Sequence, residues 1–200
     1  MHQVKVEETK DGGRRELWNV AGPVDVRYDF HNGKLLAETW LKNGKQHRDR
    51  KKPAETKWFE SGTLSGLSYY KDGNLHRDNK LPAYVRLWET GRPKRIEWWV
   101  NGRMHHVGGP VLAVFDSAGK PTRQEWGING YLHRPDGPAV VTPKTNTWYI
   151  DGQRVPPRKA LVSGRRKVMN AARVTQLLKP AGVTRAGLGN DNLAEVYKFL

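Results

Sequence analysis

Four histidines that recur at a near-constant interval are the side chains in this chain best suited to chemistry. They are His47, His76, His105 and His133. A metal site needs three or four ligands within a few ångströms of one ion. If each interval adds two or three strands to a sheet, neighbouring histidines lie roughly 10–14 Å apart. That distance excludes a shared metal ion and a catalytic histidine pair. We therefore predict a structural role, in which each imidazole binds its own proline loop, in preference to ligand contact.

Cations follow most of these histidines directly in the sequence. Arg48, Arg77 and Arg134 take this place in three copies, and His106 takes it in the remaining one. A row of cations at regular spacing could follow a phosphate backbone. It could equally be a solvated sheet edge, where positive charge discourages edge-to-edge pairing. The pattern leaves both open, and the three arginines are candidate nucleic-acid-binding residues.

A second group of cations lies near the C-terminus. It consists of Arg158, Lys159, Arg165, Arg166, Lys167 and Arg173. Residues 165–178 are predicted to form a helix whose apolar residues share one arc, with cations opposite. Such a helix face suits phosphate contact, although an ordinary solvated face is the alternative. Because no base-reading motif accompanies these cations, we expect any nucleic-acid binding to be weakly sequence-specific.

Enzyme motifs are missing from the sequence. There is no P-loop, no dinucleotide-binding G-x-G-x-x-G, no G-x-S-x-G and no H-E-x-x-H. Carboxylates are scattered and outnumbered, so no acid/base pair can be nominated. We therefore predict a protein without catalytic activity, cofactor or metal ion, and an enzyme with its site in the loops is the least favoured alternative.

The charge of the chain points to an anionic partner. The net charge is +15 and the isoelectric point is near 10.1. Residues 156–200 carry nine Lys or Arg against Asp191 and Glu195, which gives +7 for that segment. Basic proteins attract polyanions, and this excess is larger than solubility requires. A polyanion partner is therefore favoured over charge that serves solubility alone.

Turn signals recur through most of the chain and define the elements that must position these residues. They are Asn43-Gly44, Asp72-Gly73, Asn101-Gly102, Asn129-Gly130 and Asp151-Gly152, and the first four glycines are 29, 29 and 28 residues apart. Asn-Gly and Asp-Gly between apolar flanks favour type I′ hairpin turns. A fixed period of this length indicates a repeat architecture. No helical periodicity is visible before residue 156.

These signals predict a mainly β fold, an elongated antiparallel meander of about five ~29-residue repeats followed by a small helical appendage. We place a β-hairpin repeat domain at 1–155 and a basic helix-loop-helix tail at 156–200. All eight tryptophans, from Trp18 to Trp148, fall in the repeat part. For them, core packing is favoured over a base-stacking surface. The chain contains no cysteine, so disulfides and thiolate metal sites are excluded.

The recurring aromatic-glycine hairpins resemble the MORN family, and more closely the divergent MORN-like repeats of bacterial, phage and giant-virus proteins. The resemblance covers roughly Trp18 to Gly152. It implies an elongated, twisted antiparallel sheet that acts as a scaffold or binding platform without catalysis. The period here is longer than the family's usual one, the Tyr-x-Gly-Glu opening is absent, and a His-Arg…Gly-Pro-Ala loop is added. The family's partner classes are therefore not carried over.

The preferred function is non-enzymatic, weakly sequence-specific binding of RNA or DNA through the basic tail and a basic sheet edge. The alternative is a protein-interaction module, of phage or viral type, that binds an acidic surface of a host protein. The N-terminus lacks the apolar run of a signal peptide, and no segment approaches the roughly 18 apolar residues that cross a bilayer. We therefore expect no membrane contact and a cytoplasmic protein, in the host cytoplasm if phage-encoded.

Overall fold

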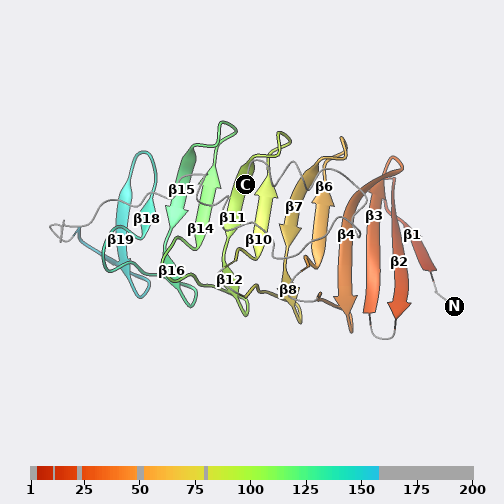
Figure 1. The fold of residues 1–200 in the computed structure, drawn as a ribbon, viewed down its shortest axis with the longest axis horizontal. Coiled ribbons are helices and arrows are strands. Elements are labelled where there is room, and N and C mark those ends of the chain that lie inside the picture. The colour runs from red at the N-terminus through yellow and green to blue at the C-terminus, as the bar shows by residue number, and fades with distance from the viewer. Residues whose placement is uncertain (1–3, 11, 22–23, 49–51, 79–80, 158–200) are drawn as a thin grey trace.

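The computed structural model describes residues 4–10, 12–21, 24–48, 52–78 and 81–157. These residues form an elongated antiparallel meander whose strands lie side by side along the long axis of the molecule (Figure 1). The prediction of a mainly β, antiparallel meander is confirmed. The predicted helix-loop-helix tail falls on residues 158–200 and lies outside the described residues.

Within the described residues, fourteen strands join one sheet, and each neighbouring pair is antiparallel. In chain order they are β1 (Val4–Glu8), β2 (Gly13–Ala21), β3 (Val24–His31), β4 (Lys34–Lys42), β5 (Lys45–Gln46), β6 (Glu55–Trp58), β7 (Leu64–Ser68), β10 (Tyr84–Leu87), β11 (Pro93–Glu97), β14 (Leu112–Phe115), β15 (Pro121–Glu125), β18 (Val140–Val141), β19 (Asn146–Ile150) and β20 (Gln153–Val155). Three short hairpins stand apart from it: β8 (Tyr70–Lys71) with β9 (Asn74–Leu75), β12 (Trp99–Val100) with β13 (Arg103–Met104), and β16 (Gly127–Ile128) with β17 (Tyr131–Leu132).

The core lies on one face of the sheet. Cross-strand partners share a face, and the row Leu67, Val85, Ile96 and Ala113 is apolar across four successive strands. Ile96 and Ala113 are 0% exposed. The core cluster is completed by Leu64, Leu87, Trp98 and Phe115. Side chains from the intervening positions point to the opposite face, which carries charged residues such as Arg95 and Glu97.

The recurring Asn-Gly and Asp-Gly turns have the predicted geometry. At Asn101-Gly102 the φ angles are 48° and 74°, and both residues of each of the other four turns are also positive. Positive φ at both central positions defines the type I′ turn, whose twist matches the flanking strands. Asparagine, aspartate and glycine tolerate this conformation best, which explains why only these residues occupy the turns.

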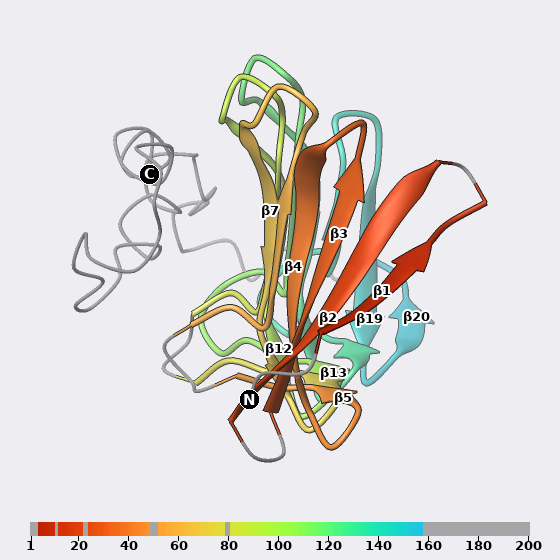
Figure 2. The same cartoon turned by 90° about the vertical axis from the view of Figure 1, so that its right-hand side faces the viewer.

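Each turn belongs to a small hairpin at the lower end of the main strands, where Figure 2 shows β5, β12 and β13 together. We call the hairpins β4–β5, β8–β9, β12–β13, β16–β17 and β19–β20 the hairpin row. One aromatic residue joins each of the first four hairpins to the sheet. The Tyr69 N–H donates to the Ala83 carbonyl in the sheet at 2.7 Å, and its carbonyl accepts from the His76 N–H in the hairpin at 2.9 Å. Trp40, Trp98 and Trp126 make the same pair of contacts.

Backbone hydrogen bonds hold successive hairpins together. The Gly73 N–H donates to the Gln46 carbonyl at 2.8 Å, and the Gly102 N–H donates to the Leu75 carbonyl at 2.9 Å. Gly130 and Gly152 bind the carbonyls of Met104 and Leu132 in the same way. The glycine of each turn after the first therefore binds the preceding hairpin, which fixes the spacing along the row.

Candidate anion-binding site

The four recurring histidines link each hairpin to the next turn. The Asp72 N–H donates to His47 Nδ1 at 3.1 Å, and the Asn101 N–H donates to His76 Nδ1 at the same distance. His105 and His133 accept likewise from the N–H groups of Asn129 and Asp151. The Nδ1 atom of each imidazole therefore binds the following turn and not the proline loop of its own copy. The predicted contact with that loop is made by His76, whose Nε2 lies 3.0 Å from Asp78 Oδ1. The stacking of the hairpins brings the following turn, which is distant in sequence, over the imidazole.

The next residue in each copy makes the contact with the proline loop. Arg77 Nη1 donates to the Pro82 carbonyl at 3.1 Å, and the guanidinium carbon lies 3.7 Å from the centroid of the Tyr69 ring. Arg48 and Arg134 make the same contacts with Pro53 and Trp40, and with Pro138 and Trp126. His106 replaces the arginine in the remaining copy. Its Nδ1 lies 2.9 Å from the Pro110 carbonyl, and its ring stacks on Trp98 with centroids 4.9 Å apart.

This arrangement gives Arg48, Arg77 and Arg134 a structural role. Each guanidinium lies on an aromatic face and also binds the carbonyl of its loop, which combines cation–π and charge-assisted contacts. Arg48 additionally pairs with Glu38 at 3.2 Å, and Arg77 is only 9% exposed. The arginines therefore recur for reasons of folding. Phosphate contact by these residues stays a prediction.

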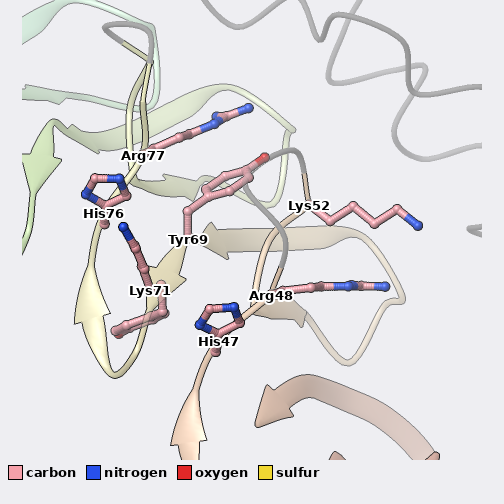
Figure 3. A pocket seen from close by; sticks show the side chains of 8 residues that line it. His47, Arg48, Lys52, Tyr69, Lys71, His76 and Arg77 are labelled. Carbon is pink, nitrogen blue, oxygen red and sulfur yellow. The ribbon is translucent and has the colours of Figure 1, made fainter. Parts of the chain in front are cut away.

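A hollow between the hairpins that turn at Asn43-Gly44 and Asp72-Gly73 brings several cations together (Figure 3). Its volume is about 210 Å³, and it is lined by His47, Arg48, Lys52, Tyr69, Tyr70, Lys71, His76 and Arg77. Four of these side chains are Lys or Arg, and none is a carboxylate. Carboxylates just outside the lining pair with three of its members: Glu38 with Arg48, Asp72 with His47 and Asp78 with His76. The positive charge that remains, above all that of Lys52 and Lys71, attracts anions. We call this hollow the cationic pocket.

The tyrosines of the cationic pocket do not offset its charge. Burial raises the pKa of the Tyr69 hydroxyl above its ordinary value, although Arg77 and Arg48 act in the opposite direction. Burial is also the main cause that raises the pKa of Tyr70, followed by the charge of Glu55. Both phenols therefore stay neutral near pH 7 and can act as uncharged hydrogen-bond donors.

Lys52 and Lys71 distinguish the cationic pocket from the equivalent places in other copies. The residue before the loop proline is Lys52 here and Leu81, Gly109 or Gly137 elsewhere. The residue before the turn is Lys42 or Lys71 in the first two hairpins and Val100, Ile128 or Ile150 in the later ones. Neither the Lys52 nor the Lys71 ammonium group pairs with another residue that the structure describes. The hairpin architecture therefore does not require these lysines.

Sequence reasoning identified Arg48 and Arg77 but missed Lys52, Lys71 and Tyr70. A position-by-position alignment of the copies would have revealed the lysines, because aliphatic residues or glycine replace them later in the chain. Arg134 lies in a later copy, away from the cationic pocket. The tail cations Arg158, Lys159, Arg165, Arg166, Lys167 and Arg173 lie outside the described residues.

No family model, curated protein or solved structure matches this chain. The resemblance to MORN-like repeats therefore stays a prediction. In the described part of the chain, no three His, Asp or Glu side chains form a group that could hold a metal ion. The same residues include no helix long and apolar enough to cross a membrane.

Proposed function

We propose that the protein binds nucleic acid, RNA or DNA, without catalysis and with weak sequence specificity. The observation that supports this most directly is the cationic pocket, which four Lys or Arg side chains line, two of them, Lys52 and Lys71, without a partner among the described residues. The excess of positive charge over the whole chain, +15, supports it as well. Phosphates are the anionic groups that such cations bind in nucleic acids.

In this proposal the β-meander of about five MORN-like copies is a scaffold. The cationic pocket supplies a phosphate contact, and the predicted helical tail adds further cations. Lys52 and Lys71 contribute charge that no described partner neutralises, whereas Arg48 and Arg77 are already oriented by their own loops. Contacts of this kind position a backbone without reading bases, which accounts for the weak specificity.

A protein-interaction module is the second candidate. Val100, Ile128 and Tyr131 are 37%, 38% and 62% exposed on the later hairpins. Apolar side chains grouped beside cations suit a protein partner with an acidic rim better than they suit a phosphate backbone. Such a partner would be a host protein if the chain is phage-encoded.

The two candidates differ in how binding responds to salt and nuclease. The full chain should bind a labelled oligonucleotide, and log K should fall linearly as log salt rises. Replacing Arg165, Arg166, Lys167 and Arg173 by Ala should flatten that slope by up to about 0.9 per lost phosphate contact on duplex DNA. Circular dichroism should show the sheet unchanged. Absence of oligonucleotide binding at low salt would reject the proposal, and capture of a protein partner that survives nuclease treatment would favour the second candidate.

A further inference from the structure

We infer that the edge strand β1 pairs with β1 of a second copy of this chain, so that two sheets continue into one across a twofold axis. The inference is independent of the proposed function, because it concerns an interface between copies and not a site for nucleic acid. Three features of β1 support it: its position at an open edge, the direction of its main-chain groups, and the order of its charges.

β1 is the first strand of the sheet and lies at one end of it (Figure 1). In the described part of the chain it pairs with β2 alone, and all five of its residues are exposed. The strand at the opposite end, β20, is three residues long and is followed by Pro156 and Pro157, which have no N–H group to donate. Short edge strands and prolines discourage pairing with another chain. Since β1 is longer and contains no proline, it is the better edge for a further strand.

The main-chain groups of β1 alternate between β2 and the open edge. The Thr9 N–H donates to the Gly13 carbonyl at 2.8 Å, so these two residues form a hydrogen-bonded pair. Such pairs alternate with non-bonded pairs along antiparallel strands, which turns the N–H and C=O groups of Lys5 and Glu7 towards β2. An antiparallel strand added at the edge can therefore form about six hydrogen bonds with the residues in between. These residues are Val4, Val6 and Glu8.

The charges of β1 fit a second copy of the same strand in one register. Lys5 and Glu7 share a face of the strand, and their side chains pair at 2.6 Å. A twofold axis at Val6 sets Lys5 of each copy opposite Glu7 of the other and uses all five residues of the strand. An axis at Lys5 or at Glu7 would set two like charges opposite each other, which destabilises a strand pair. The order of charges therefore favours the strand's own copy as the partner and Val6 as the centre.

Apolar side chains on the other face of β1 support the same centre. Val4 and Val6 are 43% and 53% exposed, and Trp18, the cross-strand partner of Val4, is 37% exposed. At the twofold axis Val6 packs against Val6 of the second copy, with roughly 5 Å between the Cβ atoms. The contact is a single strand pair and belongs to the small, weak class of interfaces. We therefore expect a monomer–dimer equilibrium with a dissociation constant on the order of 100 μM.

Sedimentation equilibrium of the full chain, after nuclease treatment, measures this association. At about 0.15 M salt, charges further apart than roughly 8 Å are screened, which limits repulsion between the two basic copies. The chain should pass from monomer to dimer as its concentration rises through the micromolar range. A chain that stays monomeric up to about 1 mM would overturn the inference. Species larger than a dimer would overturn it too, because a twofold interface closes with two copies.

Two variants of opposite charge identify the strand that forms the interface. Lys5→Glu leaves only carboxylates at the two charged positions of this face, and Glu7→Lys leaves only ammonium groups, so each variant alone should dimerise about tenfold more weakly. An equal mixture should form a mixed dimer, since every carboxylate then faces an ammonium group. Lys120→Glu and Glu89→Lys, in exposed loops, make the same charge changes and should dimerise like the parent.

Circular dichroism checks that all four variants keep the sheet. Dimers that persist undiminished in Lys5→Glu and in Glu7→Lys would overturn the inference, because another surface would then hold the copies together. Failure of the two variants to associate when mixed would overturn it as well, because the charges of β1 would not face each other across the axis.

Discussion

The hairpin row has two chemically different ends. Its first hairpins expose Lys42, Lys45 and Lys71, whereas the later ones expose Val100, Ile128 and Tyr131. The backbone is nevertheless the same throughout, with the same type I′ turns and the same glycine N–H bond to the preceding hairpin. The comparison teaches that the turn residues, the histidines and the loop contacts specify the backbone of each copy. The residues that flank each turn differ between copies without changing the backbone.

The largest effect is expected from a substitution that strains the turn backbone, which is the same at both ends of the hairpin row. Gly102→Val should lower the free energy of unfolding by about 2–3 kcal/mol, because φ is 74° at this position and a β-branched residue is strained there. The new Cβ would also meet Asn74 Oδ1 at 3.0 Å. Urea unfolding measures the loss. Ser117→Val, in an exposed loop, is the control and should change stability by about 0.5 kcal/mol at most. Equal losses in the two variants would contradict the role assigned to the turn.

A smaller loss is expected from the loop contact beside the cationic pocket. Arg77→Ala removes a charge-assisted bond to the Pro82 carbonyl and a cation–π contact with Tyr69, and should cost about 2 kcal/mol. Arg77→His should cost less, because His106 fills the equivalent place in the next copy. Urea unfolding compares the two with Arg103→Ala, an exposed control. If the histidine variant were no better than the alanine variant, the two residues would not share a role.

A third change should make the interface between hairpins β4–β5 and β8–β9 resemble the interface between β8–β9 and β12–β13 without affecting the fold. Lys52→Leu with Lys71→Val introduces the residues that Leu81 and Val100 provide one copy later. Stability should change by about 0.5 kcal/mol or less per site, because both side chains are exposed. Affinity for an oligonucleotide at low salt should fall about tenfold, with the salt slope flatter by up to about 0.9 per lost contact. Lys120→Leu with Lys144→Val is matched for charge and should leave affinity nearly unchanged. If the variant with Lys52→Leu and Lys71→Val bound the oligonucleotide as tightly as the parent, these two lysines would have no part in binding.

The smallest effect concerns two tyrosines, one at each end. Burial raises the pKa of Tyr69, so the folded protein holds this proton more tightly than the unfolded chain, where the pKa is about 10. The raised pKa of Tyr69 contributes to the free energy of unfolding below pH 10, and this contribution is lost as the pH rises through the pKa of the folded state. Between pH 9 and pH 11 the parent should therefore lose more unfolding free energy than Tyr69→Phe does. Tyr131→Phe, at a ring that is 62% exposed, should behave like the parent. Identical pH dependence in all three proteins would argue against burial as the cause.

The fold was largely predictable because its signals are local. Each Asn-Gly or Asp-Gly pair predicts one turn, and the regular spacing of these pairs predicts the meander. The partners of the histidines were not predictable, because Asp72 lies 25 residues from His47 and meets it only when hairpins stack. The cationic pocket was hidden for the same reason, since Lys52 and Lys71 come from different segments of the chain. Arg77 was found, but its buried contact with Tyr69 was not.

The inter-hairpin bonds formed by the turn glycines all run in one direction. From Gly73 to Gly152, each turn donates its N–H backwards to a carbonyl of the preceding hairpin. The row is therefore polar, like a head-to-tail polymer, and every internal unit offers one donor and one acceptor. A duplicated unit could be inserted, or one deleted, without leaving an unmatched group at the junction. The array can thus change length by whole units, while the lysines that define the cationic pocket stay at the boundary where they are encoded.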